Sequence, residues 1–289
     1  MQNHHFFPYI LETHVTDHCN LNCSGCTHFA PLVKGEAFTD KKIFENDLKR
    51  FKQLFADLYE IRLIGGEPLL HPDLVFFCEF TRKIYPKTNI SIFTNGMKLL
   101  EMPDIFWRTC SEKDILIKLS YYPINLDIDQ IKQKAKAHRV RIKIPKQIHQ
   151  FMKILNINGD SNPRQSFQNC QAMYKTPFLG HGKVYPCPLP PHIHFFNDYF
   201  SKHIPVTEKD YINIHEDVSP ADIMNFVNQS IPMCKWCISK RPFAKWARSG
   251  KDINEWIGVN EKFIKHFIRM AEFRVISLYQ QAKKRAKIK

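Results

Sequence analysis

Three cysteines stand within eight residues, at Cys19, Cys23 and Cys26, and this spacing constrains the chain more than any other feature. Three thiolates this close together can hold three corners of a 4Fe-4S cubane and leave one iron without a protein ligand. An open coordination position distinguishes a catalytic metal centre from a structural one. The spacing therefore favours a catalytic iron–sulfur cluster.

Two other uses of these cysteines compete with the cluster. A zinc site needs a fourth ligand, which His28 could supply from two residues beyond Cys26. A redox pair of Cys23 and Cys26 would leave Cys19 without a role. Covalent haem attachment is excluded because Thr27, and not histidine, follows Cys26. The motif alone leaves zinc open, and the downstream sequence has to decide.

Three short apolar runs follow the cysteines, and each ends in residues suited to ligand binding. These junctions are residues 61–64 before Gly65-Gly66-Glu67-Pro68, residues 90–93 before Thr94-Asn95-Gly96, and residues 115–119 before Ser120. Two glycines at a strand end let the backbone approach a ligand closely. Glu67 adds a carboxylate that can pair with an ammonium group.

CxxxCxxC, GGEP and TNG, in this order at successive strand ends, closely resemble the radical S-adenosylmethionine (SAM) superfamily. The resemblance covers residues 9–157 and implies a partial (β/α)6 TIM-like barrel with its site at the carboxyl ends of the strands. It implies that the 4Fe-4S cluster of Cys19, Cys23 and Cys26 binds the methionine half of SAM. Other expected SAM contacts are Gly65, Gly66 and Glu67 at its amino group, and Thr94, Asn95 and Ser120 near the methionine or ribose.

One position departs from that family pattern. The family usually has an aromatic residue directly before the last cysteine, where it packs near adenine, but this chain has Gly25. Phe29 or His28 is the expected replacement.

Strands and helices are expected to alternate through the first half of the chain, which predicts parallel βαβ units and an α/β fold. The expected strands are residues 8–16, 61–64, 90–94, 115–120, 140–144 and 151–157, and the expected helices are residues 40–58, 72–84, 103–110 and 127–138. A turn-rich segment follows at residues 158–163. We therefore expect a barrel core over residues 1–158 and a second region over residues 159–289.

The second region carries four further cysteines, at Cys170, Cys187, Cys234 and Cys237, and a glycine-containing hairpin is expected at residues 178–187. Four thiolates complete a tetrahedral set for either zinc or an iron–sulfur cluster. The pattern resembles the SPASM/twitch extension of radical SAM enzymes, in its shorter twitch-like form. That resemblance implies a second 4Fe-4S cluster in a small Cys-rich α+β extension. The sequence itself predicts helices at residues 219–228 and 261–285, which are expected to be packing elements. Cys78 and Cys110 lie in apolar helices and are expected to be packing residues.

The formal net charge of +14 admits RNA or an anionic membrane surface as a partner. Basic residues are densest at 132–146 and 283–289, where a solvated helix face and a terminal tail explain them better. The sequence has no signal-peptide pattern and no apolar run long enough to cross a bilayer. We therefore expect a cytoplasmic protein, in which the thiols remain reduced and available to iron.

The resemblance implies an oxidoreductase that cleaves SAM reductively and uses the 5′-deoxyadenosyl radical to abstract a substrate hydrogen. It also implies an external electron donor such as flavodoxin or ferredoxin. Few residues precede the first strand, so no peptide-recognition domain is expected there, and a small molecule such as a sugar is favoured. A peptide or protein maturase, an RNA-modifying enzyme and a non-catalytic iron–sulfur or zinc protein remain the alternatives. No catalytic residue is assigned beyond the cluster.

Overall fold

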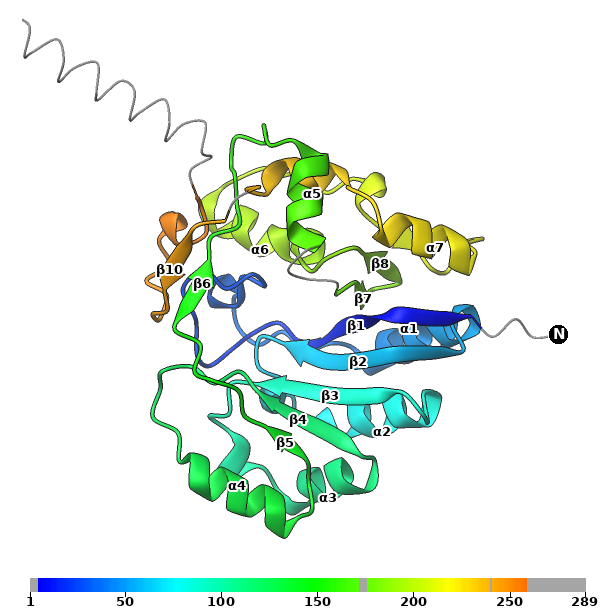
Figure 1. The fold of residues 1–289 in the computed structure, drawn as a ribbon, viewed down its shortest axis with the longest axis vertical. Coiled ribbons are helices and arrows are strands. Elements are labelled where there is room, and N and C mark those ends of the chain that lie inside the picture. Colours follow the sequence, from blue (N-terminus) through cyan, green and yellow to red (C-terminus); the bar gives the residue numbers. More distant parts are fainter. Residues whose placement is uncertain (1–4, 172–175, 240, 259–289) are drawn as a thin grey trace, which may run out of the picture.

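The computed structural model describes residues 5–171, 176–239 and 241–258, and its first half alternates strands with helices (Figure 1). The central strands are β1 (Phe6–Thr16), β2 (Asp57–Gly65), β3 (Asn89–Thr94), β4 (Ile115–Leu119) and β5 (Ile142–Lys143). The connecting helices are α1 (Lys41–Leu54), α2 (Leu74–Ile84), α3 (Asp104–Glu112) and α4 (Ile128–Ala137). This α/β order confirms the expected fold class.

The five strands pair in parallel in the order β5-β4-β3-β2-β1. Figure 1 shows α1 to α4 together on one face of this sheet, as in a partial barrel. Parallel strands joined by helices bring their carboxyl ends to one edge, where ligands bind in folds of this kind. The cysteine loop after β1 and the glycine loop after β2 therefore lie at the same edge.

Local signals explain where the first helix begins and ends. The Asp40 side chain accepts hydrogen bonds from the backbone N–H groups of Lys42 and Ile43, which caps α1. The expected extension of this helix to residue 58 is wrong, because Phe55 is already extended and β2 begins at Asp57. Leu58 continues the apolar helical pattern of α1, but it forms part of a strand because β2 buries alternate side chains in the core.

The second half of the chain adds strands to the same sheet. The hairpin of β7 (Phe178–Gly180) and β8 (Lys183–Tyr185) confirms the expected turn, and β7 lies beside β1. The sheet ends at β9 (Ile212–Asn213). The remaining helices are α5 (Pro163–Gln171), α6 (Leu189–Phe200) and α7 (Pro220–Val227). Since both halves share one sheet, the boundary near residue 158 stays a prediction.

The expected strand over residues 151–157 is mostly irregular. Only β6 (Gln150–Met152) is a strand, and it pairs antiparallel with β10 (Phe243–Lys245) outside the central sheet (Figure 1). The N–H groups of Ile154 and Leu155 donate to the carbonyl of Trp256, at 3.2 and 3.0 Å. These bonds to later segments replace those of a sixth parallel strand.

The core consists mainly of aromatic and branched side chains between the sheet and its helices. Cys78 and Cys110 are fully buried there, which confirms packing as their role. No helix in the described ranges is long and apolar enough to cross a membrane. The expected helix over residues 261–285 lies outside those ranges.

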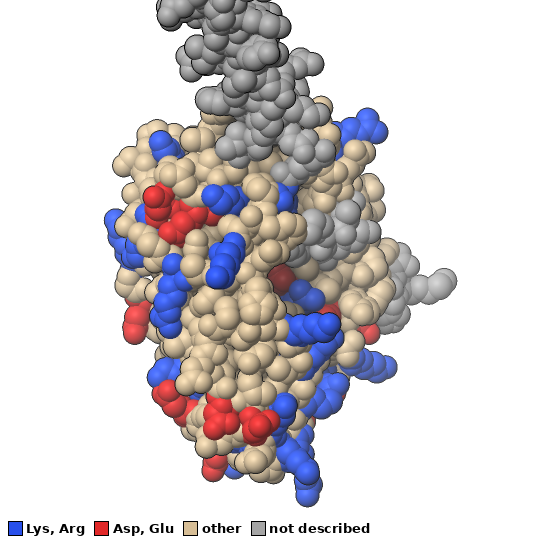
Figure 2. Space-filling view, turned by 60° about the vertical axis from the view of Figure 1, so that its left-hand side comes forward, with Lys and Arg blue, Asp and Glu red and all other residues tan. Residues whose placement is uncertain are grey.

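The positive charge is dispersed on the face drawn in Figure 2. Lys and Arg side chains are scattered over it, and Asp and Glu side chains stand between them. On α4, the Lys134 ammonium donates to the carbonyls of Leu100 and Met102, and Lys132 pairs with Asp129. These contacts fit a solvated helix face. The basic stretch at residues 283–289 lies outside the described residues.

Candidate active site

The loop of Cys19, Cys23 and Cys26 follows directly from the carboxyl end of β1. It turns through left-handed backbone at Asn22 and Gly25, with φ of 55° and 70°. A segment after β10 pairs with this loop, because the N–H of Ser24 donates to the carbonyl of Ala247 at 2.9 Å. The C-terminal region therefore helps to fix the cysteine loop in place.

Hydrogen-bond donors point at two of the three sulfur atoms. The Trp246 indole N–H lies 3.2 Å from Cys23 Sγ, and the Asn95 amide nitrogen lies 3.7 Å from Cys19 Sγ. Burial raises the pKa of the Cys19 thiol to about 11 and also raises the pKa values of Cys23 and Cys26. Free thiols hold their protons in this environment, so binding of a metal centre would release protons. Three thiols with N–H donors around them fit the ligand environment of an iron–sulfur cluster.

Gly65 and Gly66 let the loop after β2 touch the backbone that leads into the cysteine loop. The N–H of Gly66 donates to the carbonyl of Thr16 at 2.8 Å, and the N–H of Glu67 donates to the carbonyl of His18 at 3.0 Å. A Cβ at Gly66 would lie 2.5 Å from the carbonyl oxygen of Asp17. Only glycine allows this approach.

Glu67 is buried and joins the ends of β2 and β3. Its carboxylate accepts hydrogen bonds from Thr94 Oγ1 at 2.6 Å, from the N–H of Asn95 at 2.7 Å and from the N–H of Leu69 at 3.1 Å. Burial outweighs these bonds and raises the pKa of Glu67 to about 7. A cation beside Glu67 would restore the charged form. The site therefore suits an ammonium group such as that of SAM.

The structure brings all six predicted SAM contacts to one edge of the sheet. The N–H of Ser120 donates to the carbonyl of Thr94 at 2.8 Å, which links the ends of β3 and β4. Asn95 in turn bonds to the side chain of Asn20 in the cysteine loop at 2.8 Å. The sequence order of these motifs thus becomes spatial proximity, while their role in binding SAM stays a prediction.

Only one of the two residues expected near adenine is excluded. Phe29 is fully buried, with its ring near those of Phe196 and Trp256, so it is not free to contact adenine, while the role of His28 stays a prediction. Tyr122 also lies near the three cysteines, and its ring stacks with that of Trp246 at 5.7 Å between centroids. Burial, together with negative charge at the three cysteines, raises the pKa of Tyr122.

The other four cysteines meet in the second half of the chain. Cys170 lies in α5, Cys187 follows β8, and Cys234 and Cys237 lie in and after a short turn of 3-10 helix. Burial raises the pKa values of Cys187, Cys234 and Cys237, and the neighbouring thiols raise them further. Although burial opposes its charge, Arg241 has a raised pKa because these cysteines attract it. Arg241 would offset part of the negative charge of a thiolate-bound cluster.

The spacing of the cysteines is wider than a single zinc ion requires. A Zn–S bond of about 2.3 Å places tetrahedral thiolates about 3.8 Å apart. Within the described part of the chain, no three cysteine sulfurs all lie within 4.8 Å of one another. Neither cysteine group, as it stands in the described residues, is gathered as closely as a mononuclear zinc site requires.

A cavity of about 290 Å³ lies beside the C-terminal cysteine group. All four C-terminal cysteines line it, and so do Thr27 and His28, which follow Cys26 in the first cysteine loop. Most of the remaining lining is apolar and includes Phe93 and Phe151. A cavity of this size takes a small molecule.

Two charged residues from the central strands also line this cavity. The Arg62 guanidinium lies 3.1 Å from the Glu12 carboxylate, 3.5 Å from that of Glu60, and over the ring of Phe93. Lys118 and Ser91 both bond to Glu60 as well. Burial raises the pKa of Glu12, although Arg62 opposes that rise. The charges of this network compensate one another.

Sequence reasoning missed Glu12, Arg62, Trp246 and Arg241. Glu12 and His14 are two residues apart in β1, and this spacing could have placed both of them on one face of the sheet. His71, in the loop after β2, accepts a hydrogen bond from the N–H of Asp73 and packs on Phe77.

One stretch of the chain matches the model of a known protein family. Residues 13–110, from β1 into α3, match the family model described as the radical SAM superfamily. Enzymes of this superfamily use a 4Fe-4S cluster together with SAM.

Two curated relatives match less than half of the chain. One is GTP 3′,8-cyclase of Clostridium acetobutylicum, 33% identical over 126 residues, which are 42% of this chain and 35% of the relative. The other is GTP 3′,8-cyclase of Streptomyces coelicolor, 35% identical over 92 residues, which are 31% of this chain and 26% of the relative. The chain thus spans about a quarter to a third of the length of these relatives.

A solved structure is similar over nearly the whole chain. The structure of native anSMEcpe with bound AdoMet covers 93% of this chain and 98% of its own, at 16% identity and a TM-score of 0.51. This likeness supports the fold.

Proposed function

Because the chain belongs to the radical SAM superfamily through its domain at residues 13–110, we propose that it oxidises a neutral small molecule such as a sugar. The cavity of about 290 Å³ carries this proposal. Its lining includes His28, two residues beyond Cys26, and the four C-terminal cysteines, so a molecule held there would touch the second cysteine group and the loop that carries the first.

Cys19, Cys23 and Cys26 would hold the 4Fe-4S cluster, and Glu67 would accept the ammonium group of SAM. When bound, the cluster and SAM supply a 5′-deoxyadenosyl radical that takes a hydrogen atom from a C–H bond of the substrate. The buried Glu67, oriented by Thr94 and Asn95, fixes the amino end of SAM. Gly66 keeps the loop that carries Glu67 against the loop that carries the cysteines.

The charge balance of the cavity favours a neutral substrate. Arg62 and Arg241 are the cationic residues among its described lining residues, and Glu12 compensates the first while the cysteines compensate the second. The Glu12–Arg62 pair offers both acceptors and donors to hydroxyl groups, and Phe93 offers an aromatic face. These are the contacts that a sugar requires.

Cys170, Cys187, Cys234 and Cys237 would hold a second 4Fe-4S cluster, as the wide spacing of their sulfurs supports. When bound, this cluster supplies an acceptor for one electron. An alcohol carbon that loses a hydrogen atom from its C–H bond, a proton from its hydroxyl group and one electron becomes a carbonyl. The overall reaction is therefore an oxidation of the substrate by two electrons. An external donor such as flavodoxin or ferredoxin, in the cytoplasm, would supply the electron for SAM cleavage.

A paired cysteine replacement tests the second cluster. Reconstituted wild-type enzyme should contain about eight irons per chain, and Cys234→Ala/Cys237→Ala should contain about four. The control Cys78→Ala/Cys110→Ala removes two core cysteines and should keep about eight. The first variant should still release 5′-deoxyadenosine from SAM but lose the oxidised sugar product. A wild-type enzyme with four irons and one zinc would refute the second cluster.

Cyclisation of GTP is a second candidate, because the curated relatives described above are GTP 3′,8-cyclases. The enzyme is incubated with SAM, dithionite and either GTP or a panel of sugars. A product isomeric with GTP that forms only with GTP would support this candidate over sugar oxidation. The compensated charge of Arg62 predicts no turnover of the triphosphate.

A further inference from the structure

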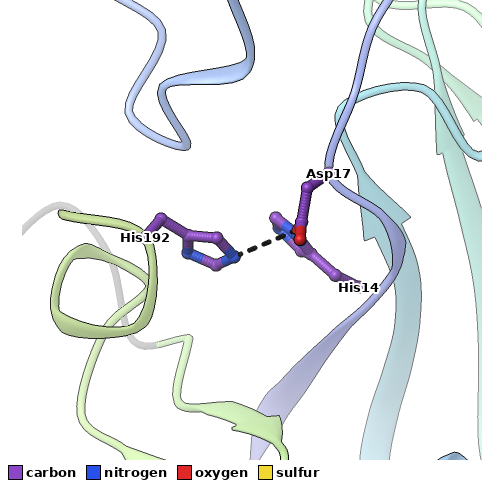
Figure 3. Close-up of side chains that lie close together, drawn as sticks. All are labelled: His14, Asp17 and His192. Carbon is purple, nitrogen blue, oxygen red and sulfur yellow. Dashed lines mark hydrogen bonds and ion pairs between the residues drawn. The ribbon is translucent and has the colours of Figure 1, made fainter. Parts of the chain in front are cut away.

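Two histidines and an aspartate meet between β1 and α6, beside the cavity (Figure 3). His14 lies in β1, Asp17 follows its carboxyl end, and His192 lies in α6. One ligand atom of each lies within 4.8 Å of those of the other two, and no other three-ligand group in the described ranges does this. Both histidines are about 95% buried or more.

The tautomer of His192 leaves a lone pair facing a carboxylate. His192 Nδ1 lies 2.6 Å from the carbonyl oxygen of Pro188, and a carbonyl can only accept, so Nδ1 carries a hydrogen. In the neutral ring, Nε2 is therefore an acceptor. It lies 3.6 Å from Asp17 Oδ1, also an acceptor (Figure 3). A cation between these two atoms would satisfy both.

His14 offers a second imidazole nitrogen to the same space. Its Nδ1 lies 2.6 Å from Asp17 Oδ1, so this is the nitrogen that could share an ion with Asp17 and His192. Metal-binding histidines characteristically donate one ring N–H to a carboxylate or a backbone carbonyl and bind through the other nitrogen. His192 shows this arrangement toward Pro188.

A protonated His192 paired with Asp17 is the alternative, because it would also satisfy the contact at 3.6 Å. Retention of a metal ion by the protein separates the two. Two imidazoles and one carboxylate are a common ligand set for divalent zinc and iron. We propose that His14, Asp17 and His192 bind a divalent transition-metal ion that ties α6 to β1.

An ion at this site would lie close to the wall of the cavity. Three protein ligands leave a coordination position for water or a substrate oxygen. The ring of His28, which lines the cavity, lies 4.7 Å from that of His14 and 5.5 Å from that of His192, between centroids. α6 also begins two residues after Cys187. The ion would therefore hold one wall of the cavity in place.

Zinc binding to the iron-loaded enzyme tests the site separately from SAM cleavage. Anaerobically reconstituted enzyme is equilibrated with Zn²⁺ and desalted, and metals are counted by mass spectrometry. Wild type should retain one zinc per chain in addition to its iron, whereas His14→Gln and His192→Gln should retain less than a tenth of that. The control His194→Gln changes an exposed histidine of the same helix and should keep the full amount.

X-ray absorption at the zinc edge keeps the test valid even if a variant does not fold. In wild-type enzyme, the bound zinc should show nitrogen and oxygen neighbours at about 2.0–2.1 Å. Sulfur neighbours at about 2.3 Å would place the zinc on cysteines and overturn the proposal. Wild-type enzyme that retains no zinc, or a His192→Gln variant that retains it fully, would overturn it as well.

Discussion

Replacing Gly66 by alanine tests whether the loop after β2 must touch the end of β1 for SAM to be cleaved. The new Cβ would lie 2.5 Å from the carbonyl oxygen of Asp17 and closer still to that of His18. These are backbone atoms, so they cannot rotate away. They must move by at least about 0.9 Å to reach the 3.4 Å of an ordinary contact.

The size of the effect follows from this displacement. Overpacking costs about 1–3 kcal/mol, and each of the two hydrogen bonds from Gly66 to Thr16 and from Glu67 to His18 contributes about 1 kcal/mol. We therefore expect the free energy of unfolding to fall by about 3–5 kcal/mol. A shift of about 1 Å at a reacting centre can cost about 100-fold in rate. SAM cleavage should fall by about that factor.

The assay is 5′-deoxyadenosine release by reconstituted enzyme with SAM and dithionite, together with urea unfolding. Gly250→Ala is the matched control, because its Cβ would meet only Glu255 Oε1, at 3.6 Å. The control should keep both its rate and its stability. A Gly66→Ala enzyme that cleaves SAM within twofold of wild type, with unchanged unfolding, would refute this reasoning.

Three further perturbations test other contacts. Trp246→Phe removes the N–H donor on Cys23 Sγ and should make the midpoint potential of the first cluster more negative in an EPR redox titration; an unchanged potential would contradict this. In metal-free protein, burial lowers the pKa of His14 from 6.5 to about 4, so its contribution to stability is full above pH 6.5 and is lost as the pH falls toward 4. Between pH 7.5 and 4, wild type should therefore lose about 3 kcal/mol more unfolding free energy than His14→Gln, and equal losses would count against the buried neutral ring. Arg62→Met leaves Glu12 without its cation and should cost about 2–3 kcal/mol at pH 8 by urea unfolding; unchanged stability would mean that the pair is not needed.

Local signals made much of the fold predictable from the sequence. The alternation of strands and helices gave the α/β class, and Asp40 marked the start of α1 through its capping side chain. Gly182, with φ of 74°, permits the tight turn between β7 and β8. Each of these features depends on residues close together in the chain, which a sequence displays directly.

The arrangement of the predicted site residues could also be predicted from the sequence. Residues at the carboxyl ends of parallel strands must meet at one edge of the sheet, so the positions of Glu67, Thr94 and Ser120 follow from the motif order. Their contacts with one another agree with this expectation. Their function in binding SAM stays a prediction.

Long-range contacts explain what the sequence did not show. Trp246 reaches Cys23 across 223 positions of the chain, and His192 meets Asp17 only because α6 packs beside β1. The segment after β6 was expected to be a strand, but its backbone bonds go to residues near Trp256. No pattern within a short window encodes such pairings.

The most direct test of the central claim is SAM cleavage by the anaerobically reconstituted chain and by its Cys19→Ala/Cys23→Ala/Cys26→Ala variant. With dithionite as reductant, wild type should release 5′-deoxyadenosine, and the variant should release none while keeping the iron of its C-terminal cysteines. Equal release from both proteins, or release from neither when wild type is fully loaded with iron, would contradict the assignment of these cysteines to a radical SAM cluster.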